Sequence, residues 1–335
     1  MTERRYTPEQ REQEKANRLE YAYTGSDTSY AVLGSLVRAI GKGWNILVIA
    51  PPDRQRIFQQ LHTELEAPEL LNVISIEQFE TAQQSQKGKF DLVVSLYSNS
   101  DVNKTIRNSP SVLGKSYVMT VDANPDPKEY DLISGFTRNR IRESGVIGIT
   151  GSGKGKTTTA LGIAMESVLE GGRGAVIQWF KEKKSGALTW AINEHNFPDA
   201  MYNPNQLSFH PTGAGFVGSP NMDRVTEEVE HREKAVEGVE LAKKLIATGE
   251  YTVIVLDEFV DTLKEVMSYL PYPLLELETV QELLALARES STQVVVTGRQ
   301  VTPEWEGFIQ DSIVISEVKH PWSSKKAGAV SGLDF

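Results

Sequence analysis

The stretch that decides the fold is Val146-Ile147-Gly148-Ile149-Thr150-Gly151-Ser152-Gly153-Lys154-Gly155-Lys156-Thr157-Thr158. It begins as a short apolar strand, turns through glycine-rich backbone, and continues with helical spacing. This order is typical of a phosphate-binding P-loop, because glycines let successive N–H groups point at one anion and the helix N-terminus adds its dipole. Lys156 is placed to reach the terminal phosphates and Thr157 to hold Mg²⁺. The expected nucleotide-binding residues are Gly151, Ser152, Gly153, Lys154, Gly155, Lys156, Thr157 and Thr158.

The glycine spacing departs from the general pattern G-x-x-x-x-G-K-[ST]. Only three residues separate Gly151 from Gly155, and Thr150 stands where the first glycine belongs. The alternative is a glycine-rich turn that binds no ligand. We favour a nucleoside triphosphate site, because the strand and helix signals on either side supply the context that the motif requires.

The composition bounds the class of protein. A length of 335 residues favours two domains, and contents of 39% hydrophobic and 24% charged residues are ordinary for a soluble globular protein. The formal net charge of −10 argues against binding to a nucleic-acid backbone. The chain has no cysteine and no apolar run of membrane-spanning length. Since the N-terminus is also too polar for a signal peptide, we expect a cytoplasmic protein with no nucleic-acid or membrane partner.

Strands and helices alternate along the chain after a polar start, which is typical of parallel sheets with helices on their faces. Residues 1–20 resemble a charged helical arm that begins at the capping residue Thr7. Residues 203–221 are rich in Pro, Gly and Asn and predict a loop, and 125–145 predict the junction between two halves. Besides the P-loop strand and helix, the expected strands are 45–49, 73–76, 90–96, 117–121, 175–180, 252–256 and 293–297, and the expected helices are 31–40, 54–65, 225–247 and 275–288.

The order of segments in the second half repeats that of the first, which suggests an internal duplication. The matching strands and helices fall in the same sequence in both halves. The matching pairs are Tyr23-Thr24-Gly25-Ser26 with Ile149-Thr150-Gly151-Ser152, Val32-Leu33-Gly34 with Ala160-Leu161-Gly162, 90–94 with 251–255, and 117–120 with 293–297.

The first half lacks the chemistry of the second, because Asp27-Thr28-Ser29 replaces the lysine-bearing loop and no acidic pair follows its later strand. We expect an α/β fold with two P-loop-like, RecA-like three-layer domains and mostly parallel sheets. The first would be a degenerate copy that lacks the phosphate-binding loop; two unrelated α/β domains are the alternative. The expected parts are the arm at 1–20, the degenerate domain at 21–135 and the loop-bearing domain at 136–335.

A second anchor of the proposed site is the apolar strand that ends in Asp257 and Glu258. In P-loop proteins such a strand delivers a carboxylate to the Mg²⁺ at the phosphates. Thr157, Asp257 and Glu258 are therefore candidate metal ligands, although a strand ending in acids is often only a strand meeting solvent. Arg299 follows another buried strand, and this position lies on the ligand side of a parallel sheet.

With both anchors in place, the second half resembles the P-loop family of corrinoid adenosyltransferases, which act on cob(I)alamin or cob(I)yrinic acid a,c-diamide. The resemblance covers about 145–335, and the family's shortened loop accounts for the irregular glycine spacing. The segments that carry it are 150–158, 176–181, 255–258, 296–299 and the closing stretch 318–335.

The resemblance implies an unusual use of ATP. In this family the Co(I) of a reduced corrinoid attacks the 5′ carbon of the ribose, and inorganic triphosphate leaves without a general base. ATP and a corrinoid would be the substrates and Mg²⁺ the cofactor, in synthesis or salvage of adenosylcobalamin. Lys156 and Arg299 are then candidate catalytic residues, and Lys156 would act with the loop and Mg²⁺ to stabilise the charge of the departing triphosphate.

One position of the family's corrinoid-facing loop departs from its pattern. The family carries two aromatic residues two positions apart, which displace the lower cobalt ligand. Phe216 matches the first, whereas Gly218 stands at the second and cannot block a ligand site. Phe216 is a third candidate catalytic residue, with packing of its loop as the alternative.

Two interpretations of function stay open at this point. The first is an ATP:corrinoid adenosyltransferase, either a homodimer or a pseudodimer in which the first half replaces a second subunit. The second is a non-catalytic ATP-binding regulatory or assembly protein that binds another protein through its N-terminal domain. An ATP-hydrolysing motor or switch fits the shortened loop poorly.

Overall fold

The computed structural model describes residues 20–25, 28–41, 43–64, 68–82, 90–109, 112, 117–121, 132–140, 145–152, 155–180, 206–214, 224–263, 273–299 and 303–319. The strands are β1 (Glu20–Gly25), β2 (Ile46–Ile49), β3 (Leu71–Ile74), β4 (Leu92–Ser95), β5 (Tyr117–Val121), β6 (Leu132–Arg140), β7 (Val146–Thr150), β8 (Gly174–Gln178), β9 (Leu207–Pro211), β10 (Val253–Asp257), β11 (Gln293–Thr297) and β12 (Asp311–Lys319). The helices are α2 (Thr28–Gly41), α3 (Pro52–Glu64), α4 (Ile76–Ala82), α5 (Ser100–Asn108), α6 (Lys156–Leu169), α8 (Arg224–Thr248), α9 (Leu277–Glu289) and α10 (Pro303–Glu306), with short 3₁₀ turns η1 (Pro68–Leu70) and η2 (Phe259–Leu263).

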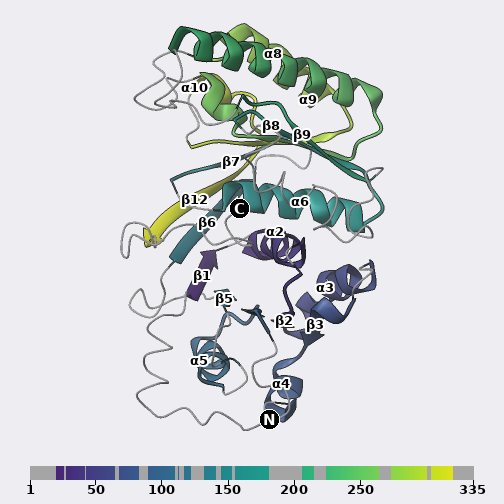
Figure 1. Cartoon of the computed structure of the whole chain (residues 1–335), viewed down its shortest axis with the longest axis vertical. Helices are drawn as coiled ribbons and strands as arrows, with labels where there is room; N and C mark the ends of the chain where they lie inside the picture. The colour runs from purple at the N-terminus through teal and green to yellow at the C-terminus, as the bar shows by residue number, and fades with distance from the viewer. Residues whose placement is uncertain are drawn as a thin grey trace.

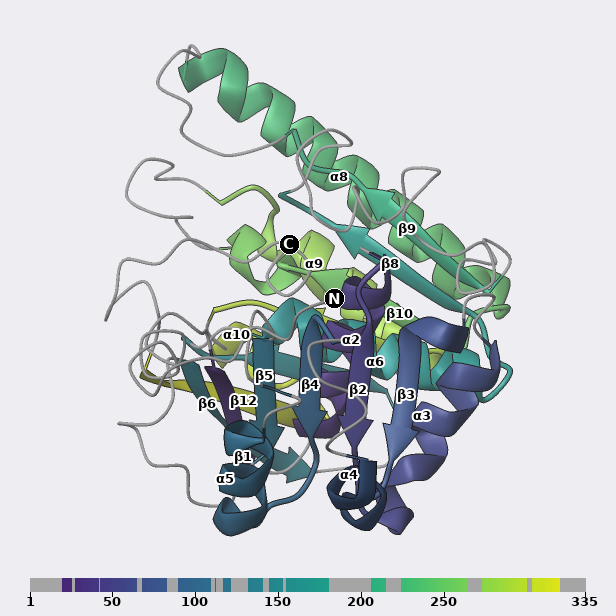
Figure 2. The same cartoon turned by 60° about the horizontal axis from the view of Figure 1, so that its bottom comes forward.

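The described strands form one sheet of 12 in the order β3-β2-β4-β5-β1-β6-β12-β7-β11-β10-β8-β9. Every neighbouring pair is parallel except β6 and β12, which are antiparallel. The expected α/β fold with mostly parallel strands is confirmed. In place of two separate sheets, the halves share one sheet through the β6–β12 pair, and Figure 2 shows β5, β4, β2 and β3 of the first half side by side.

The strand order is the same on either side of β6–β12, which relates the halves by a pseudo-two-fold axis. Thr24 pairs with Gly135 and Thr150 pairs with Val314, and the two threonines correspond in the repeat. Gly135 therefore corresponds to Val314, and Phe136 to Ile315. Since Phe136 is paired with Ile315 across β6 and β12, each faces its own counterpart. Such self-pairing is the signature of a two-fold, isologous contact.

The layers are arranged around a central pair of helices (Figure 1). Helices α2 and α6 lie between the two halves of the sheet, where they bury one large apolar core with both. A second core lies under α8 and α9 on the outer face of the second half. A third core packs α4 and α5 on the outer face of the first half. The central core makes the two halves one packed body.

Two glycines allow α2 and α6 to approach closely. A Cβ on Gly34 would lie 2.0 Å from the Thr158 carbonyl oxygen, and a Cβ on Gly162 would lie 2.0 Å from that of Tyr30. The two contacts are equivalent in the repeat, because Gly34 corresponds to Gly162 and Tyr30 to Thr158. The helices thus obey the same pseudo-two-fold relation as the strands.

Three segments differ from the sequence-based prediction. Residues 207–211, expected to be a loop, form the edge strand β9, in which Leu207 is buried and an edge position tolerates Pro211. Strand β6 occupies the expected junction and spans both 135 and 136, where we placed the domain boundary. Glu20, expected to end the helical arm, begins β1, and the rest of the arm lies outside the described residues.

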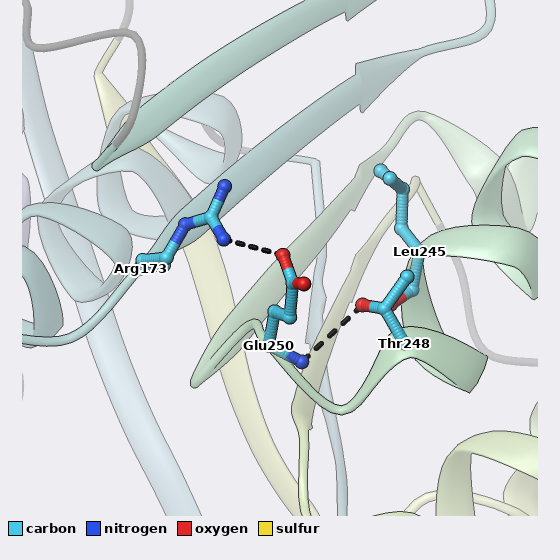
Figure 3. Close-up of polar contacts among 4 residues, drawn as sticks. All are labelled: Arg173, Leu245, Thr248 and Glu250. Atoms are coloured by element: carbon cyan, nitrogen blue, oxygen red, sulfur yellow. Dashed lines mark hydrogen bonds and ion pairs between the residues drawn. The ribbon is translucent and has the colours of Figure 1, made fainter.

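A cluster of polar contacts lies at the amino-terminal edge of the strands of the second half (Figure 3). Arg173 Nη1 donates to Glu250 Oε2 at 2.5 Å, and Glu250 N donates to Thr248 Oγ1 at 3.2 Å. The Thr248 hydroxyl donates to the carbonyl of Leu245 at 2.7 Å where α8 ends. The ion pair is exposed and contributes at most about 1 kcal/mol to stability. Because ligands of parallel sheets bind at the opposite, carboxyl edge, we assign this cluster a structural role.

Candidate active site

The phosphate loop lies between β7 and α6, at the carboxyl edge of the second half. Gly151 has φ of 115° and Gly155 has φ of 109°, backbone conformations that favour glycine. A Cβ on Gly151 would also lie 2.0 Å from the carbonyl oxygen of Ile315 on β12. The loop therefore needs glycine at Gly151 both for its turn and for its packing against the neighbouring strand.

Lys156 is the first residue of α6, and its side chain folds back over the loop. Its Nζ donates to the carbonyl of Gly151 at 2.8 Å. Burial lowers the pKa of Lys156 below the ordinary lysine value, and the positive charge of Arg299 acts in the same direction. The nearby carboxylates of Asp261, Glu258 and Asp257 oppose this lowering of the pKa. An ammonium group partly removed from water in this way gains strongly from an anionic ligand.

Asp257, at the end of β10, is the polar centre of the site. Its carboxylate has no exposed surface. Oδ1 accepts hydrogen bonds from the hydroxyls of Thr157 and Thr297, each at 2.8 Å, and Oδ2 accepts one from Gln178 Nε2 at 3.0 Å. A buried carboxylate held by three donors is fixed in position and compensated for its loss of water. This fixed group directs the Thr157 hydroxyl at the start of α6.

Glu258 and Arg299 frame the site through their backbones. Glu258 has φ of 63°, which turns the chain out of β10, and its N–H donates to the Thr297 hydroxyl at 2.8 Å. Arg299 N donates to Asp261 Oδ1 at 3.0 Å, and the Arg299 carbonyl accepts from Gly151 N at 3.2 Å. The Arg299 side chain is exposed. The segments after β10 and β11 are thereby tied to the phosphate loop.

Two hydrogen-bonded pairs, Lys156 with Gly151 and Thr157 with Asp257, form a group at the start of α6. Thr158 is different, because it is buried, with 6% of its surface exposed. Ser152 and Gly155 lie in the loop beside this group. The other predicted residues, Gly153, Lys154 and Phe216, lie outside the described residues.

Three residues of this site were missed by the sequence interpretation. Gln178 and Thr297 end the strands on either side of β10 and both bond to Asp257. Asp261 is the carboxylate that most strongly opposes the lowered pKa of Lys156. The signal that could have found Gln178 and Thr297 is a single polar residue at the end of each neighbouring apolar strand.

The donor set around Thr157 fits a magnesium ion that is bound together with phosphates. Mg²⁺ is commonly held by one or two carboxylates, with substrate phosphates and water completing an octahedron. The Thr157 hydroxyl and the Asp257 carboxylate, 2.8 Å apart, offer such a partial set. Over the described residues, no cluster of three or more His, Cys, Asp or Glu side chains could hold a metal by itself. Within the same ranges, no helix is long and apolar enough to cross a membrane.

Comparison with known proteins identifies a family for the second half of the chain. The family model described as "ATP:corrinoid adenosyltransferase BtuR/CobO/CobP" matches residues 143–335, which include every site residue named above. Residues 1–142 lie outside that match.

Individual relatives match the same part of the chain. The corrinoid adenosyltransferase of Escherichia coli (strain K12) is 31% identical over 190 residues, which cover 57% of this chain and 85% of that protein. Corrinoid adenosyltransferase CobA of Salmonella typhimurium (strain LT2) is 32% identical over 213 residues, covering 62% of this chain and 94% of that protein. The corrinoid adenosyltransferase of Pseudomonas aeruginosa is 30% identical over 196 residues, covering 58% and 85% respectively.

Proposed function

The chain belongs to the ATP:corrinoid adenosyltransferase family, and on this premise we propose that it transfers the 5′-deoxyadenosyl group of ATP to the cobalt of a reduced corrinoid. The observation that carries the proposal is the Lys156, Thr157 and Asp257 group inside the family match. The reaction would serve adenosylcobalamin synthesis or salvage.

The bond changes in this reaction require little acid–base chemistry from the protein. The electron pair of Co(I) forms the bond from cobalt to the 5′ carbon of the ribose. The bond from that carbon to the triphosphate oxygen breaks, and inorganic triphosphate leaves with its electron pair. No proton moves, so a general base is unnecessary. The protein must instead bind the triphosphate, stabilise its growing charge and align the carbon with the cobalt.

The residues of the loop can perform the first two tasks. The backbone N–H groups at the start of α6 and the Lys156 ammonium would bind the phosphates. Lys156 would exchange its hydrogen bond to the Gly151 carbonyl for one to a phosphate oxygen. Alignment of the two substrates can contribute about 7–11 kcal/mol to lowering the barrier. We keep Arg299, Phe216 and Glu258 as proposed contributors to this alignment and charge stabilisation.

Magnesium is proposed as the companion of ATP at this site. Thr157 and Asp257 would hold the ion, and its charge would neutralise part of the triphosphate. Gln178 and Thr297 would keep the Asp257 carboxylate oriented, because both donate hydrogen bonds to it.

We also propose that the first half is a degenerate copy that retains the fold and has lost the nucleotide-binding site. Its strand order supports a common origin. Leu92 and Val253 begin β4 and β10 at equivalent register, so Leu96 takes the place of Asp257. Leu96 is buried and cannot orient a metal ion. The chain would then act as an intrachain pseudodimer with one active nucleotide site, without needing a second copy or another protein.

Adenosyl transfer is tested with purified protein, Mg-ATP and chemically reduced cobalamin, followed by absorbance of the adenosylated product. The wild-type chain should form product, and Lys156→Ala should form almost none because it loses the charge that binds triphosphate. ATP binding without product, with several reduced corrinoids, would favour the non-catalytic regulatory function instead.

The number of nucleotide sites is tested separately by calorimetric titration with ATP. We expect one ATP per chain. Two sites of similar affinity would show that the first half kept a nucleotide site and would overturn its assignment as a degenerate copy.

A further inference from the structure

A buried arginine of the first half lies on the face of α2 that meets α6. Tyr30 and Gly34 mark this face, because both contact α6 closely. Arg38 follows Gly34 by four residues, and residues four apart on a helix lie on the same side. Arg38 is only 7% exposed, and charged side chains are seldom buried to this extent. It therefore belongs to the interface between the two halves.

The direction of the helices determines which part of α6 Arg38 approaches. Tyr30 meets Gly162, whereas Gly34, one turn later on α2, meets Thr158, one turn earlier on α6. Moving toward the C-terminus of α2 thus moves toward the N-terminus of α6. The next turn of α2 carries Arg38, and the next turn back on α6 is the phosphate loop. Arg38 is consequently placed at the phosphate-binding end of α6.

The symmetry-related residue supplies independent evidence for this placement. Gly34 and Gly162 correspond, so the counterpart of Arg38 is Glu166. Glu166 lines a cavity of about 400 Å³ together with Thr28 and Ser29, the first residues of α2. The pseudo-two-fold relation carries that neighbourhood onto Arg38, Lys156 and Thr157 in the other half. A side chain at this helix position thus faces the start of the opposite helix.

The charge at this position differs between the halves in the way that nucleotide binding requires. The site with the lysine-bearing loop receives an arginine from α2, whereas the corresponding end of α2 receives the acid Glu166 from α6. An arginine stabilises phosphate oxygens through charge-assisted hydrogen bonds, and an acid repels them. The two equivalent positions, Arg38 and Glu166, therefore carry opposite charges, although Arg54 and Arg56 also line the cavity at Glu166.

We infer that Arg38 binds the triphosphate of ATP in the second half, so that the first half completes the nucleotide site across the pseudo-dimer interface. This inference rests on the proposed function in that the loop must bind a nucleoside triphosphate. It gives the first half a direct role at the active site, in addition to the proposed loss of its own nucleotide site. Arg38 acts on the phosphate end of ATP and leaves the adenosine end untouched.

The test compares the affinities of wild type, Arg38→Met and Arg38→Lys for ATP, inorganic triphosphate and adenosine in Mg²⁺ by calorimetry. Arg38→Met keeps the apolar stem and removes the charge, so ATP and triphosphate should bind about 10-fold to 100-fold more weakly. Adenosine affinity should stay within twofold, and Arg38→Lys should recover part of the loss. Glu166→Gln, at the symmetry-related position, is the matched control and should leave ATP affinity within twofold.

Two outcomes would overturn the inference: unchanged ATP affinity in Arg38→Met, or an equal loss for ATP and adenosine, which would mark a merely structural role. If Arg38→Met does not fold, as judged by its thermal midpoint, Arg38→Gln replaces it with the same expected result. These titrations contain no corrinoid. Loss of triphosphate affinity in the variants, alongside a wild type that forms no adenosylated product, would support Arg38 while overturning adenosyl transfer.

Discussion

Replacing Gly34 or Gly162 by alanine tests the helix contact on which the pseudo-two-fold arrangement depends. The new Cβ would lie 2.0 Å from a carbonyl oxygen of the facing helix, and real Cβ atoms essentially never approach closer than 3.0 Å. The helices must therefore separate by about 1 Å. Such overpacking costs about 1–3 kcal/mol of unfolding free energy. The higher helix propensity of alanine offsets at most about 1 kcal/mol of this loss in unfolding free energy. After a full gain of about 1 kcal/mol is subtracted, we expect each variant to be destabilised by up to about 2 kcal/mol.

Denaturant unfolding measures this change as a shift of the transition midpoint. The double variant should lose less stability than the sum of the two single variants, because one separation of α2 and α6 relieves both clashes. Gly307→Ala is the control, since nothing lies within 4 Å of a Cβ there. It should change the unfolding free energy by no more than about 0.5 kcal/mol. Stabilisation of Gly34→Ala or Gly162→Ala, as expected for an open helix position, would refute the close packing.

Three further predictions concern the site. Asp257→Asn should abolish most of the gain in ATP affinity that Mg²⁺ provides, measured by titration with and without the ion; a variant that keeps the full gain would contradict the assigned metal ligand. Thr157→Val removes a hydroxyl at nearly constant shape and should weaken Mg-ATP binding by about 10-fold, whereas Thr157→Ser should bind within a few-fold of wild type. Because its pKa is lowered, Lys156 loses its charge at a lower pH than an ordinary lysine does. ATP affinity should therefore fall as the pH is raised through the pKa of Lys156. Lys156→Arg stays charged and should show a flatter decline, and identical profiles would argue against Lys156 as a phosphate ligand. The stability of the free protein should move in the opposite direction over that window, rising with pH, because the unfolded chain holds the Lys156 proton more tightly.

The core of the site was predictable because its residues carry local signals. Glycines between an apolar strand and a helix indicate the phosphate loop. The position of Asp257 at the end of an apolar run indicates a carboxylate at the end of a strand. Gln178 and Thr297 carry no such signal alone. Each matters only because β8 and β11 flank β10, and the sequence does not state which strands are neighbours.

The strand pairing that joins the two halves could not be predicted from the sequence, for a similar reason. The repeat indicated that the strand order recurs, yet β6 mixes polar and apolar residues and does not look like a strand. Its extended form is set by tertiary pairing with β1 and β12. Strand β9 was missed because Pro211 and the surrounding polar residues are typical of a loop. Its structure is decided instead by its pairing with β8 at the edge of the sheet.

The most direct test of adenosyl transfer is the molar ratio of the two products. Protein is mixed with excess ATP labelled in its terminal phosphate and a limiting amount of reduced corrinoid, and the reaction is quenched at several times. The account predicts adenosylated corrinoid and inorganic triphosphate in equal molar amounts, with the label retained in triphosphate. Release of labelled orthophosphate without adenosylated corrinoid would contradict it.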